Sequence, residues 1–201
     1  EAFALASSAE RSFGILLTGV QPDSEPGVST FPGKLREGRY LGSGDEEAIV
    51  IGSVLARNLK VTVGDELTFL GSGRDGSFAA GVATVVGIIN SGMTSLDRSI
   101  AEIPLGYFQD IFAMDNDVHT IVITVDDLDD VAPLEQRVQN QLPGPELTVL
   151  DWDQLQPGLR QAIQADMFSA FIMYAVLIVL VAFSVLNTQL MSVLERTREF
   201  G

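Results

Sequence analysis

The sequence contains no cysteine and a single histidine among its 201 residues. The absence of cysteine excludes disulfides, thiol catalysis and thiolate metal sites, and it leaves the cellular compartment open. His119 would have to act alone in any histidine metal site or Ser-His-Asp arrangement. Its position after Asp115, Asn116 and Asp117, at the entrance of an expected strand, is explained by a polar strand end without any function. We therefore expect no enzyme, no metal site and no cofactor.

Basic residues are also scarce, with 12 Lys and Arg against 27 Asp and Glu and a net charge of −15. The charges near the C-terminus cancel one another, so the acidic excess lies in the part of the chain up to Asp166. A domain with this charge repels nucleic acid and anionic lipid. We expect no nucleic-acid partner.

Charged residues of either sign are missing from Met167 to Leu194. Within that stretch, Phe168 to Leu186 is apolar except for two serines, and its nineteen residues would cover roughly 28 Å as a helix. This length matches the hydrocarbon core of a bilayer, so the sequence predicts a membrane helix. Two arginines follow the stretch closely, whereas the nearest preceding basic residue is Arg160, which places the Gly201 end in the cytoplasm and the large domain outside.

No signal peptide is expected at Glu1–Ala6, which has neither a basic region nor an adequate apolar run. Both ends of the sequence look cut from something longer.

Strand-like runs and turn residues dominate the first half. The stretch Ile15–Val20 is followed by a turn-rich loop, and short strands with a Gly-Asp turn and a long valine-rich strand at Phe78–Ile89 suggest a small β-barrel from about Asp45 to Pro104. Gly71–Gly76 reads as a hairpin loop, since it lacks the Lys-Ser/Thr ending of a phosphate-binding loop. A short helix, Leu105–Phe112, is expected to leave the barrel.

A β-α-β unit is expected next, with strands at His119–Val125 and Leu147–Leu150 around an amphipathic helix at Leu128–Leu142. If Ile15–Val20 pairs with these later strands, the barrel is inserted into an α/β layer. Four acidic residues, at 126, 127, 129 and 130, precede the helix. They could hold Ca²⁺, but their spacing is not that of an EF-hand, and stabilisation of the helix N-terminus explains them better.

The expected fold class is α+β, with an α/β porter-like layer, an inserted small β-barrel-like subdomain and a long helix that becomes transmembrane. The corresponding ranges are 1–44 and 111–152 for the layer, 45–110 for the insertion, and 153–201 for the stalk, the membrane helix and a cytoplasmic end. Methionine and aromatic residues at 167–174 either line a path for a hydrophobic substrate or pack against lipid and other helices. Small residues in the same span favour a helix bundle.

The charged end, Glu195–Glu199, continues the helix with acids and arginines at helical spacing. An ordered amphipathic end at the inner membrane surface suggests that something docks there. Alternatively, these residues simply end the helix among the lipid headgroups.

The segment from Leu186 to Gly201, which reads Leu-Asn-Thr-Gln-Leu-Met-Ser-Val-Leu-Glu-Arg-Thr-Arg-Glu-Phe-Gly after the apolar span, resembles the end of the second membrane helix of FtsX-like permeases, the membrane subunits of MacB-type ABC transporters. Earlier in the chain, four segments resemble the periplasmic core domain of these permeases more loosely and come in the expected order. They are Leu35–Leu41, Ala48–Ala56, Val63–Leu67 and Val85–Ile88.

This resemblance implies a bacterial inner-membrane permease with four membrane helices and a large periplasmic domain between the first two. It implies a dimer with a second permease copy or paralogue, and a separate or fused ABC ATPase whose hydrolysis is transmitted as movement to the periplasm. Carried over to this sequence, the ATPase-coupling candidates are Glu195, Arg196, Arg198, Glu199 and Phe200. Asn187 and Thr188 are candidates for contacts within the helix bundle, or for bonds to backbone and water.

Two transport roles remain open, namely release of lipoproteins toward the outer membrane and efflux of drugs or peptides, and the ending of the sequence leans toward lipoprotein release. A membrane-tethered sensor or scaffold that binds a periplasmic partner without transport is the alternative from another class. An anchored hydrolase is poorly supported, because no nucleophile, base and orienting group can be proposed together.

Overall fold

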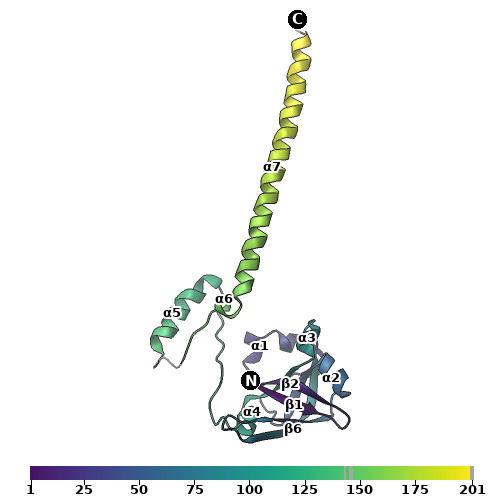
Figure 1. The fold of residues 1–201 in the computed structure, drawn as a ribbon, viewed down its shortest axis with the longest axis vertical. Coiled ribbons are helices and arrows are strands. Elements are labelled where there is room, and N and C mark those ends of the chain that lie inside the picture. Colours follow the sequence, from purple (N-terminus) through teal and green to yellow (C-terminus); the bar gives the residue numbers. More distant parts are fainter. Residues whose placement is uncertain (143, 145–146, 200–201) are drawn as a thin grey trace. The chain divides into compact units, whose positions relative to one another are not determined.

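The computed structural model describes residues 1–142, 144 and 147–199, without the side chains of 157 and 195–199. The chain divides into two compact units, Glu1–Thr124 and Val125–Gly201. Figure 1 traces both along the chain.

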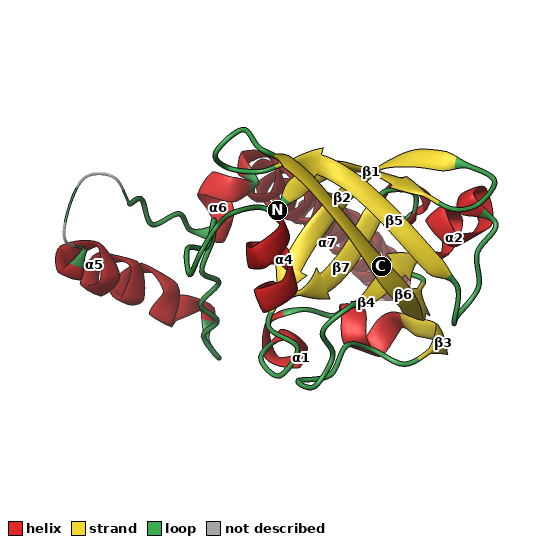
Figure 2. Cartoon of the chain, turned by 90° about the horizontal axis from the view of Figure 1, so that it is seen from below, coloured by secondary structure: helices red, strands yellow, loops and turns green. Residues whose placement is uncertain are grey.

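The first unit is built on a β-barrel. Its strands, within the described residues, are β1 (Ala2–Ser7), β2 (Ser12–Val20), β3 (Leu35–Gly38), β4 (Ala48–Gly52), β5 (Glu66–Ser72), β6 (Phe78–Ile89) and β7 (Ile100–Pro104). They form one sheet in the order β3-β6-β4-β7-β2-β1-β5, and an additional pairing of β5 with β6 closes six of them into a ring (Figure 2). Most neighbours are antiparallel, while β2 pairs with β7 and β4 with β6 in parallel.

Alternation along the strands decides which side chains fill the barrel. Ile15 and Leu17 of β2 and Leu67 and Phe69 of β5 are almost fully buried in one large apolar cluster. Complete burial of such a side chain stabilises a fold by about 1.5–3 kcal/mol relative to exposure. A second, smaller apolar cluster includes Val50, and it packs beneath the segment that joins β2 to β4.

The long strand β6 changes partners along its length. Its first half pairs with β5, and its second half pairs with β4 and β3. A Cβ at Gly81 would lie 2.5 Å from the Ile111 side chain, and one at Gly87 would lie 2.2 Å from the Arg39 carbonyl oxygen. Both glycines therefore allow close packing against the strand.

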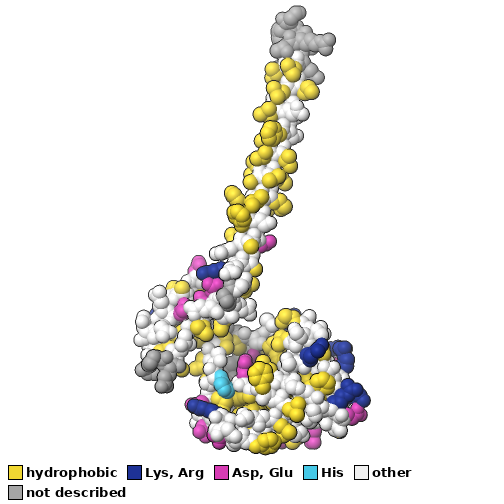
Figure 3. All heavy atoms as spheres, viewed as in Figure 1, with side chains coloured by type: hydrophobic (Ala, Val, Ile, Leu, Met, Phe, Trp, Pro, Cys, Tyr) yellow, Lys and Arg dark blue, Asp and Glu magenta, His cyan; other side chains and the backbone are white. Residues whose placement is uncertain are grey.

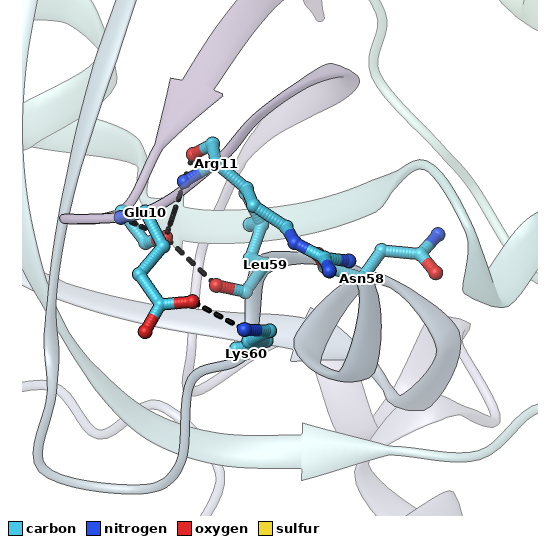
Figure 4. A network of polar contacts seen from close by, with 6 residues as sticks. Glu10, Arg11, Asn58, Leu59 and Lys60 are labelled. Carbon is cyan, nitrogen blue, oxygen red and sulfur yellow. Dashed lines mark hydrogen bonds and ion pairs between the residues drawn. The ribbon is translucent and has the colours of Figure 1, made fainter.

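Short helices cover the barrel. They are α1 (Glu25–Val28), the 3-10 helix η1 (Phe31–Lys34), α2 (Ser53–Leu59), α3 (Thr94–Asp97) and α4 (Leu105–Ile111). The C-terminal end of α2 is fastened to the turn between β1 and β2: the Ser8 hydroxyl donates to the Leu59 carbonyl, Arg11 donates to the Asn58 carbonyl, and Lys60 pairs with Glu10 (Figure 4).

The second unit is helical in its described residues. Its elements are η2 (Leu128–Asp130), α5 (Val131–Gln141), α6 (Trp152–Leu155) and α7 (Pro157–Glu199). The α7 helix is continuous over 43 residues. The α+β class, the barrel and the long apolar C-terminal helix are thus confirmed.

The β-α-β expectation is wrong in its strands. Residues 119–125 and 147–150 are not strands, and Ile121 and Val122 are 77% and 62% exposed. Ile15–Val20 pairs with β1 and β7 instead. The physical reason is that a β-branched run becomes a strand only beside a free sheet edge, whereas ring closure has used the edges of six strands.

The central helix of that unit is present as η2 and α5. The four-part division into a layer, an insertion and a stalk stays a prediction.

Candidate functional site

The α7 helix exposes its apolar side chains along the membrane-like stretch. Phe171 and Leu180 are 70% and 63% exposed, and the apolar side chains follow the helix in Figure 3. The helix from Gly158 to Leu194 is long and apolar enough to cross a bilayer, and none of its most apolar part is buried against the described chain. Its 37 residues would span roughly 55 Å, well beyond the bilayer core of roughly 30 Å. An apolar helix with this much exposed surface is unfavourable in water, so lipid or other helices must cover it.

The start of α7 is ordered by local contacts. The Asp151 carboxylate accepts a hydrogen bond from the Gln154 backbone N–H and caps α6. Arg160 on the first turns of α7 pairs with Asp153 at 2.9 Å. Pro157 stands at the first position of the helix, where its missing N–H is not needed. The expected helical stalk therefore runs without a break into the apolar stretch.

The two candidates for bundle contacts, Asn187 and Thr188, come directly after the most apolar stretch, Phe168–Leu186. The Thr188 hydroxyl donates to the Ser184 carbonyl of its own helix at 3.0 Å, and both Asn187 and Thr188 are exposed. The Thr188 bond satisfies its hydroxyl without a second helix. A role of either residue in a helix bundle stays a prediction.

The backbone of the coupling candidates is partly described. Glu195, Arg196, Arg198 and Glu199 belong to α7, which places positions 195, 198 and 199 on one side of a helix with 3.6 residues per turn. Their side chains lie outside the described residues, as does the whole of Phe200. Docking of an ATPase on this side stays a prediction.

The barrel unit carries a buried acidic group that the sequence reading missed. Glu102 on β7 is 2% exposed, and its carboxylate accepts a hydrogen bond of 2.6 Å from the Tyr40 hydroxyl. Burial, opposed by this hydrogen bond and helped by the nearby negative charge of Glu25, raises the pKa of Glu102 to about 7. The only available signal was a single acid inside the apolar run Ile100–Pro104.

A second buried acid has a structural role. Asp97 at the end of α3 accepts hydrogen bonds from the Ser91 backbone N–H and hydroxyl at 2.9 and 2.6 Å and from the Ser53 hydroxyl at 3.3 Å. These bonds join the exit of β6 to the start of α2 and satisfy the carboxylate.

An open cleft of about 900 Å³ lies between the end of β2, the loop before β4 and the start of α4. Its lining includes Asp23, Asp45, Glu46, Glu47 and Asp110. Arg39, just outside the cleft, donates twice to Asp45, and this hydrogen bonding lowers the pKa of the Asp45 carboxyl. The cleft is thus strongly acidic.

The other residues singled out from the sequence have local roles. The His119 ring lies 3.1 Å from the amino group of Glu1, and partial burial lowers its pKa. The Asp127 carboxylate accepts from the Asp129 backbone N–H and caps η2, which agrees with the helix-start interpretation. Gly71–Gly76 lies at the β5–β6 hairpin, where Ser72 pairs with Phe78. Within the described residues, no group of acids and histidines is placed to hold a metal ion.

The sequence matches a known protein family over most of its length. The sequence profile of the MacB-like periplasmic core domain matches residues 2–141. The chain belongs to this family. It carries the core domain of an FtsX/MacB-type ABC transporter permease, which confirms the resemblance read from its C-terminal segment.

The curated relatives of this family member point the same way. The chain is 23% identical to the lipoprotein-releasing system transmembrane protein LolC of Neisseria meningitidis over 206 aligned residues, which cover 98% of this chain and 49% of that protein. It is 27% identical to LolC of Xylella fastidiosa over 199 residues, which cover 96% and 48%. The chain therefore spans about half the length of the curated relatives it matches. Family and relatives imply an inner-membrane protein with a periplasmic domain.

Proposed function

We propose that this chain is part of a permease that releases lipoproteins from the inner membrane, with ATP hydrolysed by a partner ABC ATPase and the movement passed to the periplasmic domain through α7. The observation that carries the proposal is the extent of the similarity to LolC, which runs over 96–98% of the chain and so includes both the barrel and the apolar helix. A similarity confined to the core domain would fit any permease of the family.

The continuity of α7 supports the mechanical part. The helix runs from Pro157 to Glu199, and beyond its first position Gly158 is its only glycine or proline. A helix without an internal hinge passes a displacement at its cytoplasmic end to its periplasmic end. Glu195, Arg196, Arg198, Glu199 and Phe200 are the proposed meeting point with the ATPase.

The full-length permease, reconstituted in proteoliposomes with its ATPase and an acylated lipoprotein, tests the substrate. Lipoprotein released in an ATP-dependent manner supports the proposal. ATP turnover that responds to drugs or peptides and not to lipoprotein would assign the protein to efflux, and an absence of any ATPase partner would favour the tethered scaffold.

A charge reversal tests the coupling surface separately. In the variant with Glu195→Arg and Arg198→Glu, we expect the permease-dependent stimulation of ATP hydrolysis to fall several-fold. The matched control is Glu10→Lys with Lys60→Glu, which reverses an exposed ion pair of the barrel. Equal stimulation in both variants would remove these residues from the coupling role.

A further inference from the structure

The segment between β2 and β4 covers the outer face of the barrel. This cover segment, residues 21–43, contains α1, η1 and β3, and it packs on the smaller apolar cluster, which includes Val20, Val50 and Ile100 from the sheet and Leu41 from the segment itself. Its two ends line the acidic cleft, through Gln21–Ser24 and through Gly42 and Ser43. Movement of the segment would therefore change the cleft.

Backbone pairing joins the cover segment to the sheet at β3 and at the residues on either side of it. Its strand β3 has three paired residues with β6, and a register shift between Leu35 and Glu37 interrupts them. Two backbone hydrogen bonds flank this pairing, from the Arg39 N–H to the Val86 carbonyl and from the Asn90 N–H to the Lys34 carbonyl. The side-chain hydrogen bond between the cover segment and the sheet beneath runs from Tyr40 to Glu102.

Glu102 lies at the contact between the cover segment and the sheet. Ile100 of the same strand, two residues away, belongs to the covered cluster, so Glu102 points to the same face. Its directly opposite neighbours are Thr18 of β2 and Val50 of β4, neither of which carries a charge.

The charged and titratable groups near Glu102 come from the cover segment. Tyr40 donates its hydroxyl, and Glu25 of α1 contributes a negative charge. Among the described residues no Lys or Arg forms an ion pair with Glu102. An ionised carboxylate in this position would be buried with one hydrogen bond, next to a like charge and with no cation.

We propose that the cover segment is a proton-controlled flap, closed while the Glu102 carboxyl is neutral and loosened when this carboxyl ionises. Loosening moves Glu102 toward water, exposes the apolar outer face of β4 and β7, and reshapes the acidic cleft at both ends of the flap. This would be a conformational response of the periplasmic unit that is independent of the ATPase.

The direction of the response follows from the protonation of Glu102. Its pKa of about 7 in the closed state lies above that of a solvated glutamate, so the closed state binds the proton more tightly. Closure is therefore strongest at low pH, weakens as the pH rises toward 7, and becomes constant above it.

The natural lack of cysteine permits a direct test in the full chain in detergent micelles. A cysteine replaces Leu41 of the flap, whose side chain is 5% exposed in the closed state. Its rate of maleimide labelling is divided by that of Met93→Cys, which is 58% exposed outside the flap. This ratio removes the intrinsic pH dependence of the thiol. Ala101→Cys inside the barrel reports global opening and should stay protected at every pH.

The expected result is a Leu41→Cys to Met93→Cys ratio that rises roughly tenfold per pH unit between pH 5.5 and 7 and then levels off. Adding Glu102→Gln should make the ratio independent of pH. A ratio that does not change with pH, or that rises equally in the Glu102→Gln background, overturns the proposal.

Two further variants serve where Glu102→Gln does not fold. Glu25→Gln removes the neighbouring charge from a partly exposed position, and it should reduce the total rise. Tyr40→Phe removes the hydrogen bond that favours the ionised carboxylate, and the rise should then continue to a higher pH. Unchanged curves in both variants would also refute the flap.

Discussion

The membrane helix gives a quantitative prediction, because the cost of a charge depends on its depth. Between Phe168 and Leu186 lie twelve residues of the strongly apolar types Leu, Ile, Val and Phe. At about −0.4 kcal/mol for each, they favour insertion by about 5 kcal/mol. Replacing Leu177 at the centre by arginine changes this by about 3.5 kcal/mol, which leaves the helix inserted.

The double variant Leu177→Arg with Leu180→Arg doubles that cost and reverses the balance by about 2 kcal/mol. The measurement places residues 157–199 in a host membrane protein whose glycosylation reports whether the segment spans the microsomal membrane. The control carries Thr188→Arg with Met191→Arg, which begins roughly 16 Å from Leu177 along the axis, where long side chains reach the headgroups. Failure of the single variant to insert, or full insertion of the double variant, would show that the apolar stretch does not cross the bilayer as described.

Two stability predictions concern the barrel unit, both measured by thermal unfolding of the full chain in detergent through the β-sheet signal in circular dichroism. Gly52→Ala should destabilise the barrel unit by about 1–3 kcal/mol, because its Cβ would lie 2.3 Å from the Asp97 carbonyl oxygen. Gly14→Ala is the control and should be neutral, since no atom lies within 4 Å of its Cβ. Equal melting temperatures of the two variants would refute the packing argument. Asp45→Asn should cost roughly 1 kcal/mol or less at pH 7, because the partner Arg39 is largely exposed. The pKa of Asp45 is lowered in the folded state, so its contribution is present above the ordinary aspartate pKa and is lost as the pH falls through the folded value. A stability difference that does not shrink as the pH falls below the ordinary aspartate pKa would contradict this assignment.

Features with strong local causes could be predicted from the sequence. The absence of charge over Met167–Leu194 determines the long apolar helix, because few other environments accept such a surface. The hairpin loop follows from the glycines at 71–76. The C-terminal segment was specific enough to indicate the permease family, and the core-domain match confirms it.

Features that depend on distant pairing could not be predicted in this way. Residues 119–125 have the composition of a strand, but a strand also requires a neighbour, and β1 and β2 belong to the barrel instead. Which runs find each other is decided by closure of the ring, and local propensity carries no information about it. The range expected for the barrel contains β4 to β7 and omits β1 and β2, which pair with strands far from them in the sequence.

The buried acid escaped detection for a similar reason. Glu102 has ordinary sequence neighbours, and its environment is produced by Tyr40 and Glu25, which are 62 and 77 residues away in the chain. A burial pattern alone would have favoured an apolar residue at this position of β7. Only the three-dimensional arrangement shows that the carboxyl is covered.

Ring closure also limits how two such domains can associate. In most of the described barrel each backbone edge already has a partner, so a neighbouring copy cannot add its own strand to the sheet. The exception is β3, which is four residues long and irregularly paired, a poor template for a foreign strand. Contacts between two such barrels are therefore left to side chains and loops, which can form and separate again without unfolding either barrel.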